Sequence, residues 1–133
     1  METVLCILAA LIIGSLGLIH LLYTLLGNKF APADTLLKER MKDERLNITK
    51  ETSCWLAWIG FNTSHSLGLL FFSAIYIYLI LYDFDFVRNS IFLSLMPVFF
   101  TFIYLVLAKV YWFRIPFWGF MTSFILFTVS TLL

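Results

Sequence analysis

Four long stretches of the chain are almost entirely apolar, and the charged residues lie in the shorter stretches between them. About 20 apolar residues in a row are enough for a helix to cross the hydrocarbon core of a bilayer. The pattern therefore predicts an all-α membrane protein whose four spans pack as an antiparallel up-down bundle, in a single domain covering residues 1–133. The predicted spans are residues 3–26, 54–82, 90–108 and 115–133.

The first apolar stretch has the position of a signal peptide, but two features disfavour that interpretation. Met1 and Glu2 place no positive charge in front of it, and no small-residue cleavage site follows it. A secretory signal peptide has a positively charged N-terminal region and a cleavage site of small residues. We therefore expect the first stretch to be a retained helix.

The first connection, residues 28–53, is the only long polar segment. Within it, Leu37, Met41 and Leu46 share one side of a predicted helix that Asp34 would cap. This pattern is typical of a short amphipathic helix that lies in the membrane interface. The second connection is predicted to be a short turn around residues 83–88, and the third a tight aromatic turn over residues 109–114.

Positively charged residues are concentrated in the first and third connections. Cytoplasmic loops carry an excess of Lys and Arg, whereas the second connection holds only Arg88. We therefore expect residues 28–53 and 109–114 to be cytoplasmic and both termini to lie outside, with four tryptophans forming an aromatic belt at the inner boundary. The cations are Lys29, Lys38, Arg40, Lys42, Arg45, Lys50, Lys109 and Arg114, and the tryptophans are Trp55, Trp58, Trp112 and Trp118.

Composition supports a membrane location and disfavours several classes of function. Hydrophobic residues make up 62% of the chain and charged residues 13%, whereas soluble domains carry roughly 25% charged residues. The net charge of +1 creates no field that would attract nucleic acid. No catalytic motif is recognisable, and no span contains the carboxylate of a proton-coupled exporter or the arginines of a voltage sensor. Cys6 and Cys54 are predicted near opposite membrane faces, beyond disulfide reach.

The second span carries a stripe of small residues beside a polar stripe that contains Trp58, Asn62 and His65. Small residues four apart allow the backbones of two helices to approach closely in lipid. Gly17 offers the same possibility in the first span. The predicted helix-packing residues are Ala57, Gly60, Ser64, Gly68 and Gly17.

Polar side chains of the first three spans are predicted to converge in the cytoplasmic half of the bundle, because the helix rise places them at similar depths. Polar groups inside a membrane are expensive and often mark a functional site. The candidate ligand-binding residues are His20, Tyr23, Thr24, Trp58, Asn62, His65, Ser66 and Tyr104.

Three interpretations of this polar cluster remain open. The first is a pocket for a lipid-like or other small amphiphilic ligand. The second is that the side chains only hydrogen-bond to one another, which suits a non-catalytic assembly or partner subunit of a membrane complex. The third is electron transfer through a haem held by His20 and His65, as in four-helix b-type cytochromes. No other metal site is predicted, because no intramembrane carboxylate or thiol accompanies the two histidines.

Four segments also carry a resemblance to known proteins: HLLYTLLG in the first span, Phe30 to Asp34, WIGFNTSHSLG in the second span, and KVYWFRIP before the fourth. They resemble a small family of bacterial four-span integral membrane proteins of unknown function. The resemblance covers nearly the whole chain and implies four spans in a bacterial inner membrane, but no activity. The predicted residues that it shares are His20, Tyr23, Thr24, Asn62, Ser64, His65 and Ser66.

Overall fold

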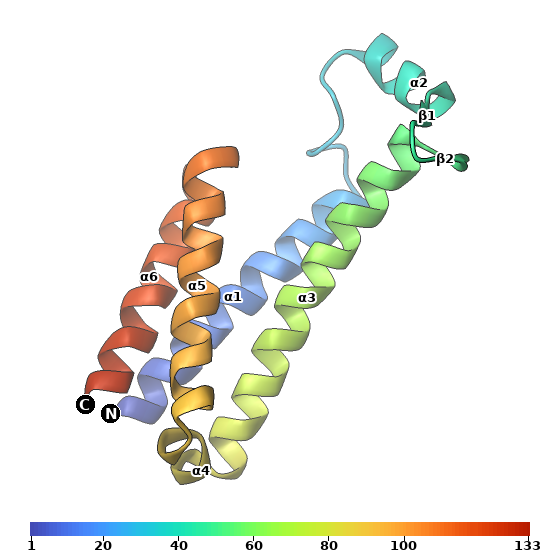
Figure 1. Ribbon diagram of the computed structural model, residues 1–133. Coiled ribbons are helices and arrows are strands. Elements are labelled where there is room, and N and C mark those ends of the chain that lie inside the picture. The colour runs from blue at the N-terminus through green and yellow to red at the C-terminus, as the bar shows by residue number, and fades with distance from the viewer. The chain divides into compact units, whose positions relative to one another are not determined.

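The computed structural model describes residues 1–133 and is almost entirely helical (Figure 1). Four helices are long and apolar enough to cross a membrane, which confirms the predicted all-α class and the number of candidate spans. These are α1 (Glu2–Leu25), α3 (Cys54–Tyr82), α5 (Ile91–Tyr111) and α6 (Arg114–Leu132). The connections contain the short helices α2 (Thr35–Asp43) and α4 (Phe84–Asn89) and the strands β1 (Arg45–Leu46) and β2 (Thr49–Ser53).

Contacts within the chain divide it into two compact units. Residues 1–16 and 69–133 form the first unit, and residues 17–68 form the second. The boundaries fall inside α1 and α3, so each of these helices contributes one part to each unit.

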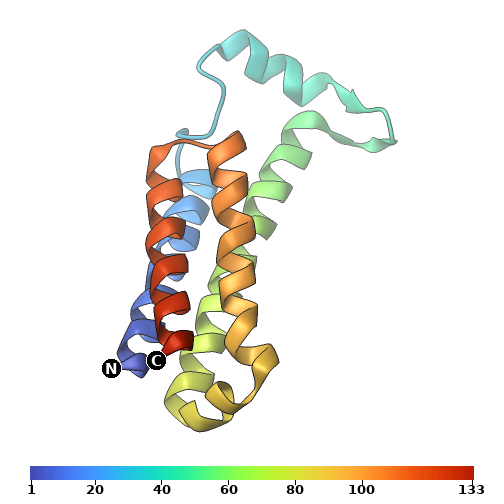
Figure 2. The same cartoon turned by 60° about the vertical axis from the view of Figure 1, so that its left-hand side comes forward.

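The first unit contains α5 and α6, which lie side by side (Figure 2). Its core consists of aliphatic and aromatic side chains. Phe72 of α3 stacks on Phe100 of α5, with ring centroids 3.9 Å apart, and such pairs stabilise a core beyond the area they bury. The largest side chains that are almost completely buried are Ile13, Leu69, Tyr76, Phe120 and Phe127.

Small residues allow α1 to approach its neighbours closely in this unit. Ser123 of α6 donates a hydrogen bond to the carbonyl oxygen of Ala9 at 3.2 Å, and Ser73 of α3 donates to that of Ala10 at 2.7 Å. One turn further along α1, a Cβ added to Gly14 would stand only 2.6 Å from the hydroxyl oxygen of Ser73. Hydroxyl groups can therefore reach the α1 backbone, as is common where membrane helices pack.

Pro97 interrupts the hydrogen-bond ladder of α5, and a side chain of another helix repairs the interruption. Proline has no N–H, so the carbonyl group of Leu93, four residues earlier, loses its usual donor. The hydroxyl of Tyr76 on α3 donates to this oxygen at 2.8 Å. Tyr76 is only 2% exposed. The tyrosine therefore supplies the hydrogen bond that the proline removes.

A capped helix stands where the sequence predicted a short turn between α3 and α5. Asp83 caps α4 by accepting from a first-turn N–H, and the single hydroxyl proton of Ser94 is shared between the carbonyl oxygens of Val87 and Arg88, each 3.0 Å away. Arg88 also pairs with Glu2 at the start of α1, with 2.9 Å between nitrogen and oxygen. These contacts satisfy both ends of α4, which explains why six residues suffice for a helix.

The turn between α5 and α6 is shorter than predicted. α5 continues to Tyr111 and α6 begins at Arg114, so only Trp112 and Phe113 lie between them. The helix continues past Lys109, which the sequence placed in the turn, because a cation in the last turn interacts favourably with the helix dipole. The backbone N–H of Trp112 closes α5 by donating to Ala108 at 3.2 Å.

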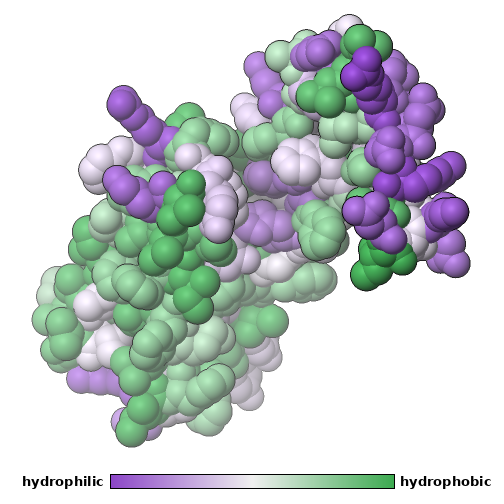
Figure 3. Space-filling view, turned by 45° about the horizontal axis from the view of Figure 1, so that its top comes forward, coloured by the Kyte–Doolittle hydropathy of each residue, from purple (hydrophilic) through white to green (hydrophobic).

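The second unit contains the polar segment, whose hydrophilic side chains are visible in Figure 3. The carboxylate of Asp34 caps α2 by accepting from the N–H of Leu36 at 2.8 Å. β1 and β2 pair as a small antiparallel hairpin that the sequence did not predict. Leu46, assigned to the apolar side of a helix, lies in β1 instead. The ammonium group of Lys38 lies 5.0 Å from the ring centroid of Trp55, which joins α2 to α3.

Removing the Tyr76 hydroxyl should destabilise the protein by an amount that depends on Pro97. We expect Tyr76→Phe to lower the free energy of unfolding by about 1–3 kcal/mol, because the Leu93 carbonyl then stays buried without a donor. In a Pro97→Ala background the alanine N–H restores the helical hydrogen bond. Tyr76→Phe should then lower the free energy of unfolding by less than about half of its effect in the wild-type background. Unfolding of the four proteins in mixed micelles, followed by circular dichroism, measures both costs. Equal costs in the two backgrounds would contradict the proposed repair.

Candidate functional site

Two polar side chains from different spans meet in the second unit. His20 of α1 and Asn62 of α3 are joined by a hydrogen bond of 2.9 Å between Nε2 and Oδ1. The same amide donates through Nδ2 to the carbonyl oxygen of Trp58 at 2.8 Å. Since Oδ1 of Asn62 can only accept, His20 must donate to it. A neutral His20 therefore carries its proton on Nε2 and a lone pair on Nδ1.

Aromatic rings gather around the His20 imidazole. Phe30 stacks on it with ring centroids 4.3 Å apart, and His65 of α3 meets it edge-on at 5.4 Å. Nε1 of Trp58 donates to the carbonyl oxygen of Phe30 at 3.2 Å. Tyr23 completes the group, 6.2 Å from the Phe30 ring. The cluster thus joins α1, α3 and the segment that follows α1.

Two hydroxyl groups support this cluster through the backbone. Thr24 donates to the carbonyl oxygen of His20, and Ser66 donates to that of Asn62, both at 2.8 Å. Both side chains are buried. A hydroxyl has a single proton to donate, so neither group retains a donor for a ligand. Their role is to satisfy the helix carbonyls at the two residues that form the bond between spans.

Tyr104, the remaining candidate, belongs to the first unit. Its ring lies among aromatic side chains there, with centroids 4.6 Å from Phe100 and 5.0 Å from Phe120. Seven of the eight predicted residues therefore lie in the second unit, where direct contacts link them into one cluster, and one lies in the aromatic core of the first.

The small-residue stripe of α3 is open. Gly60, Ser64 and Gly68 are exposed, and a Cβ built on either glycine would meet no neighbouring atom within 4 Å. Ala57 is half-buried, and Gly17 of α1 is buried. Among the predicted packing residues, the chain itself therefore buries only Gly17.

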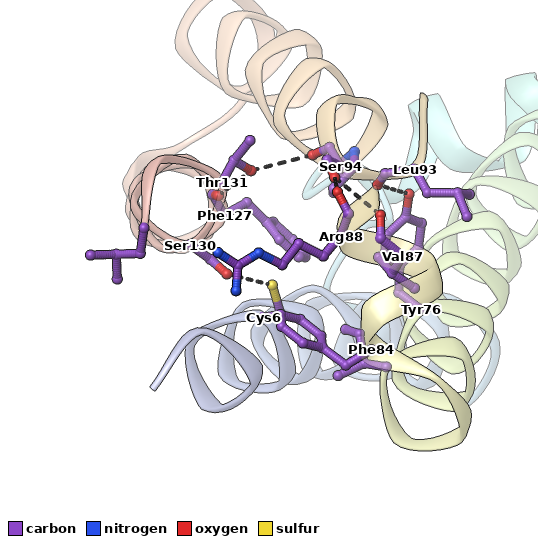
Figure 4. A pocket seen from close by; sticks show the side chains of 13 residues that line it. Cys6, Tyr76, Phe84, Val87, Arg88, Leu93, Ser94, Phe127, Ser130 and Thr131 are labelled. Carbon is purple, nitrogen blue, oxygen red and sulfur yellow. Dashed lines mark hydrogen bonds between the residues drawn. The ribbon is translucent and has the colours of Figure 1, made fainter. Parts of the chain in front are cut away.

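A small cavity of about 80 Å³ lies within the first unit, where it is lined by residues of five helices (Figure 4). The thiol of Cys6 and the hydroxyl of Ser130 face each other at 2.9 Å. Arg88 and Ser94 contribute further polar groups to the lining. One water needs roughly 10–15 Å³ of such space. The cavity therefore has room for several waters but not for a lipid-like ligand.

Sequence reasoning missed this cavity. Cys6 and Ser130 are 124 positions apart and stand singly in apolar runs, so no local spacing relates them. Arg88 was read only as a charge of the second connection, although its guanidinium is also part of the cavity lining. Only the charge pair of Glu2 and Arg88, both near predicted span ends, offered a signal.

The contacts of His20 suit a hydrogen bond to Asn62. Ligation by two histidines requires a nitrogen of each ring to face one iron. Nε2 of His20 already donates to Asn62, and Phe30 covers one face of the ring. His20 thus joins α1 to α3 through a side-chain hydrogen bond.

The chain matches no protein-family model, no curated protein sequence and no solved structure.

The bond between His20 and Asn62 should contribute measurably to stability. Hydrogen bonds between membrane helices contribute about 0.6 kcal/mol on average and up to about 1.7 kcal/mol. We expect a coupling energy in this range from a double-mutant cycle of His20→Phe and Asn62→Leu, measured by unfolding in mixed micelles. Thr122→Val is the control, because Thr122 is exposed and bonds only to its own helix, at Trp118. The contribution would be refuted if the coupling energy between His20→Phe and Asn62→Leu were no larger than the coupling energy between His20→Phe and Thr122→Val.

Proposed function

We propose that the protein is a multi-pass protein of the bacterial inner membrane, with four antiparallel spans, both termini outside and α2 in the cytoplasmic interface. The charge distribution supports this orientation, since eight of the nine Lys and Arg residues lie in the connections at residues 28–53 and 109–114. Leu36 and Leu37 of α2 are 59% and 48% exposed, which suits a helix lying on lipid. The resemblance to bacterial four-span proteins is the ground for the choice of membrane.

We propose further that the protein acts as a non-catalytic assembly subunit, which associates with another subunit through the exposed Gly60–Ser64–Gly68 face of α3. This proposal rests on the observation that all three residues are exposed and that a Cβ on either glycine would meet no neighbouring atom within 4 Å. The polar cluster supports the same conclusion, because His20 and Asn62 bind each other directly.

The two glycines are costly unless something packs on them. In a helix interior glycine is about 1 kcal/mol less favourable than alanine. At Gly14 the close Ser73 hydroxyl explains the glycine, but at Gly60 and Gly68 an alanine Cβ would meet nothing. A helix from another subunit, packed at close range against this face, would explain both positions.

The occupant that fits best is a second copy of the same chain. The face carries no charge, and its side chains are small over two helical turns, so the same face of a second copy can pack closely against it. Two copies related by a two-fold axis would bring the same stripe together from both sides. A glycine-containing stripe of this spacing is the common geometry of close helix pairs in membranes.

A small amphiphilic ligand held at the polar cluster is the second candidate function. The observation in its favour is that Tyr23 and Trp58 remain 44% and 41% exposed beside His20, whose Nδ1 lone pair can accept a hydrogen bond. An amphiphile bound there should remain attached in native mass spectra and be lost with His20→Phe. Spectra without such a ligand would remove this candidate.

The proposed orientation predicts which engineered cysteines react from outside the cell. Asn89 and Lys50 are both exposed, in α4 and β2. In a Cys6→Ser, Cys54→Ser background, Asn89→Cys should react with a membrane-impermeant maleimide in intact cells. Lys50→Cys should react only after permeabilisation. The reverse pattern would overturn the orientation, and labelling of both in intact cells would overturn the number of crossings between them.

The proposed assembly predicts that bulk on the α3 face prevents self-association. We expect Gly60→Leu combined with Gly68→Leu to weaken dimerisation on the order of tenfold or more, which corresponds to at least about 1.4 kcal/mol. Energy transfer between labelled copies in vesicles, at varied protein-to-lipid ratio, measures the dissociation constant. In the same vesicles, Ser64→Cys in a Cys6→Ser, Cys54→Ser background should form a disulfide between two copies.

Ser15→Leu is the matched control, because Ser15 is a small exposed residue of another span. It should leave the dissociation constant unchanged. A wild-type protein that stays monomeric, or a dimer equally sensitive to Ser15→Leu, would contradict association through the α3 face.

A further inference from the structure

An open hollow lies at the turn between α5 and α6, within the first unit. Its volume is about 450 Å³, in the range of roughly 300–1,000 Å³ that small-molecule sites occupy. The lining combines cations with aromatic rings. The lining includes Lys109, Trp112, Arg114, Phe117 and Trp118.

The two cations of the hollow have no acidic partner. The ion pairs of the chain are Lys42 with Glu39 and Arg88 with Glu2. No Asp or Glu occurs after Asp85 in the sequence. Lys109 and Arg114 therefore bring two uncompensated positive charges to one hollow, and an anionic ligand would remove that imbalance.

Aromatic side chains shape the hollow around these charges. The ammonium group of Lys109 lies 5.5 Å from the centroid of the Phe117 ring, which holds the lysine at the hollow. Trp118 is 61% exposed, so its indole is available at the rim. Tryptophan rings prefer the level of lipid headgroups. The lining thus combines a charged centre with a rim suited to a membrane interface.

We propose that this hollow binds the phosphate-bearing headgroup of an anionic phospholipid. Its position supports a lipid over a soluble phosphate, because a two-residue turn between two candidate spans keeps it at the bilayer surface. Basic pockets between membrane helices commonly bind anionic headgroups. Large apolar side chains of the spans flank the turn, with Val110 63% and Ile115 70% exposed, where acyl chains would lie. The site requires only that α5 and α6 cross the bilayer, and it is independent of the α3 face.

Native mass spectrometry of the full-length protein tests this site with phosphatidylglycerol and phosphatidylcholine of identical acyl chains. We expect the wild-type protein to bind the anionic lipid about tenfold more tightly. Lys109→Gln combined with Arg114→Gln should abolish most of this preference, and each single variant should lose part of it. Lys29→Gln combined with Lys50→Gln removes the same charge from exposed positions elsewhere and should retain it.

Three results would overturn the proposal. The first is a wild-type protein that binds both lipids equally, which needs no variant to fold. The second is a control double variant that loses as much preference as the variant of the hollow. The third is displacement of phosphatidylglycerol by soluble glycerol phosphate at equal concentration, which would assign the hollow to a free phosphate compound.

Discussion

The bilayer interior offers no water, so every polar group in a span must find its partner within the protein. This constraint decides where most hydroxyls of this chain point, although the buried hydroxyl of Thr63 in α3 has no hydrogen-bond partner. Thr24, Ser66, Thr101 and Thr128 each donate to a carbonyl oxygen four residues earlier in their own helix. Other hydroxyls donate hydrogen bonds to backbone carbonyls of a neighbouring helix, as Ser73 does to the carbonyl oxygen of Ala10. His20 and Asn62 each carry two polar atoms, and they form a hydrogen bond directly between side chains of α1 and α3. It consumes groups that would otherwise be candidates for ligand binding.

The same constraint explains how the two units differ. In the first unit, contacts between spans rely on close backbone approach, which Ala9, Ala10 and Gly14 permit, and on stacked aromatic rings. In the second unit, an imidazole and an amide join α1 to α3 while Trp58 secures the segment that follows α1. The surface of α3 that these contacts leave uncovered is lined with small residues, and the α5–α6 turn is left with unpaired cations.

Hydropathy alone predicted the helical class and the candidate spans, because their length and composition are local properties of the sequence. The convergence of His20, Asn62 and His65 also followed from helix periodicity. Tyr104 lies among aromatic rings of the first unit, and its depth along the helix could not predict those neighbours. The hairpin of β1 and β2 was missed because short polar segments carry weak patterns. The continuation of α5 past Lys109 was missed because the lysine was read as part of the turn, whereas a cation is favourable in the last turn of a helix. The cavity beside Cys6 depends on residues from both ends of the chain, whose proximity only the fold creates.

The contact between Tyr76 and the Leu93 carbonyl has a consequence for how this sequence can vary. Pro97 leaves the carbonyl oxygen of Leu93 without its usual donor, and the hydroxyl of Tyr76 on α3 donates to that oxygen. The same hydrogen bond allows the polar hydroxyl of Tyr76 to be buried in the core. Each residue makes the other acceptable. Relatives of this chain should therefore replace the pair together: where position 97 regains an N–H, position 76 should drift to phenylalanine or leucine. Positions 21 apart in the sequence would then covary, although neither touches the small-residue face or the hollow at the α5–α6 turn.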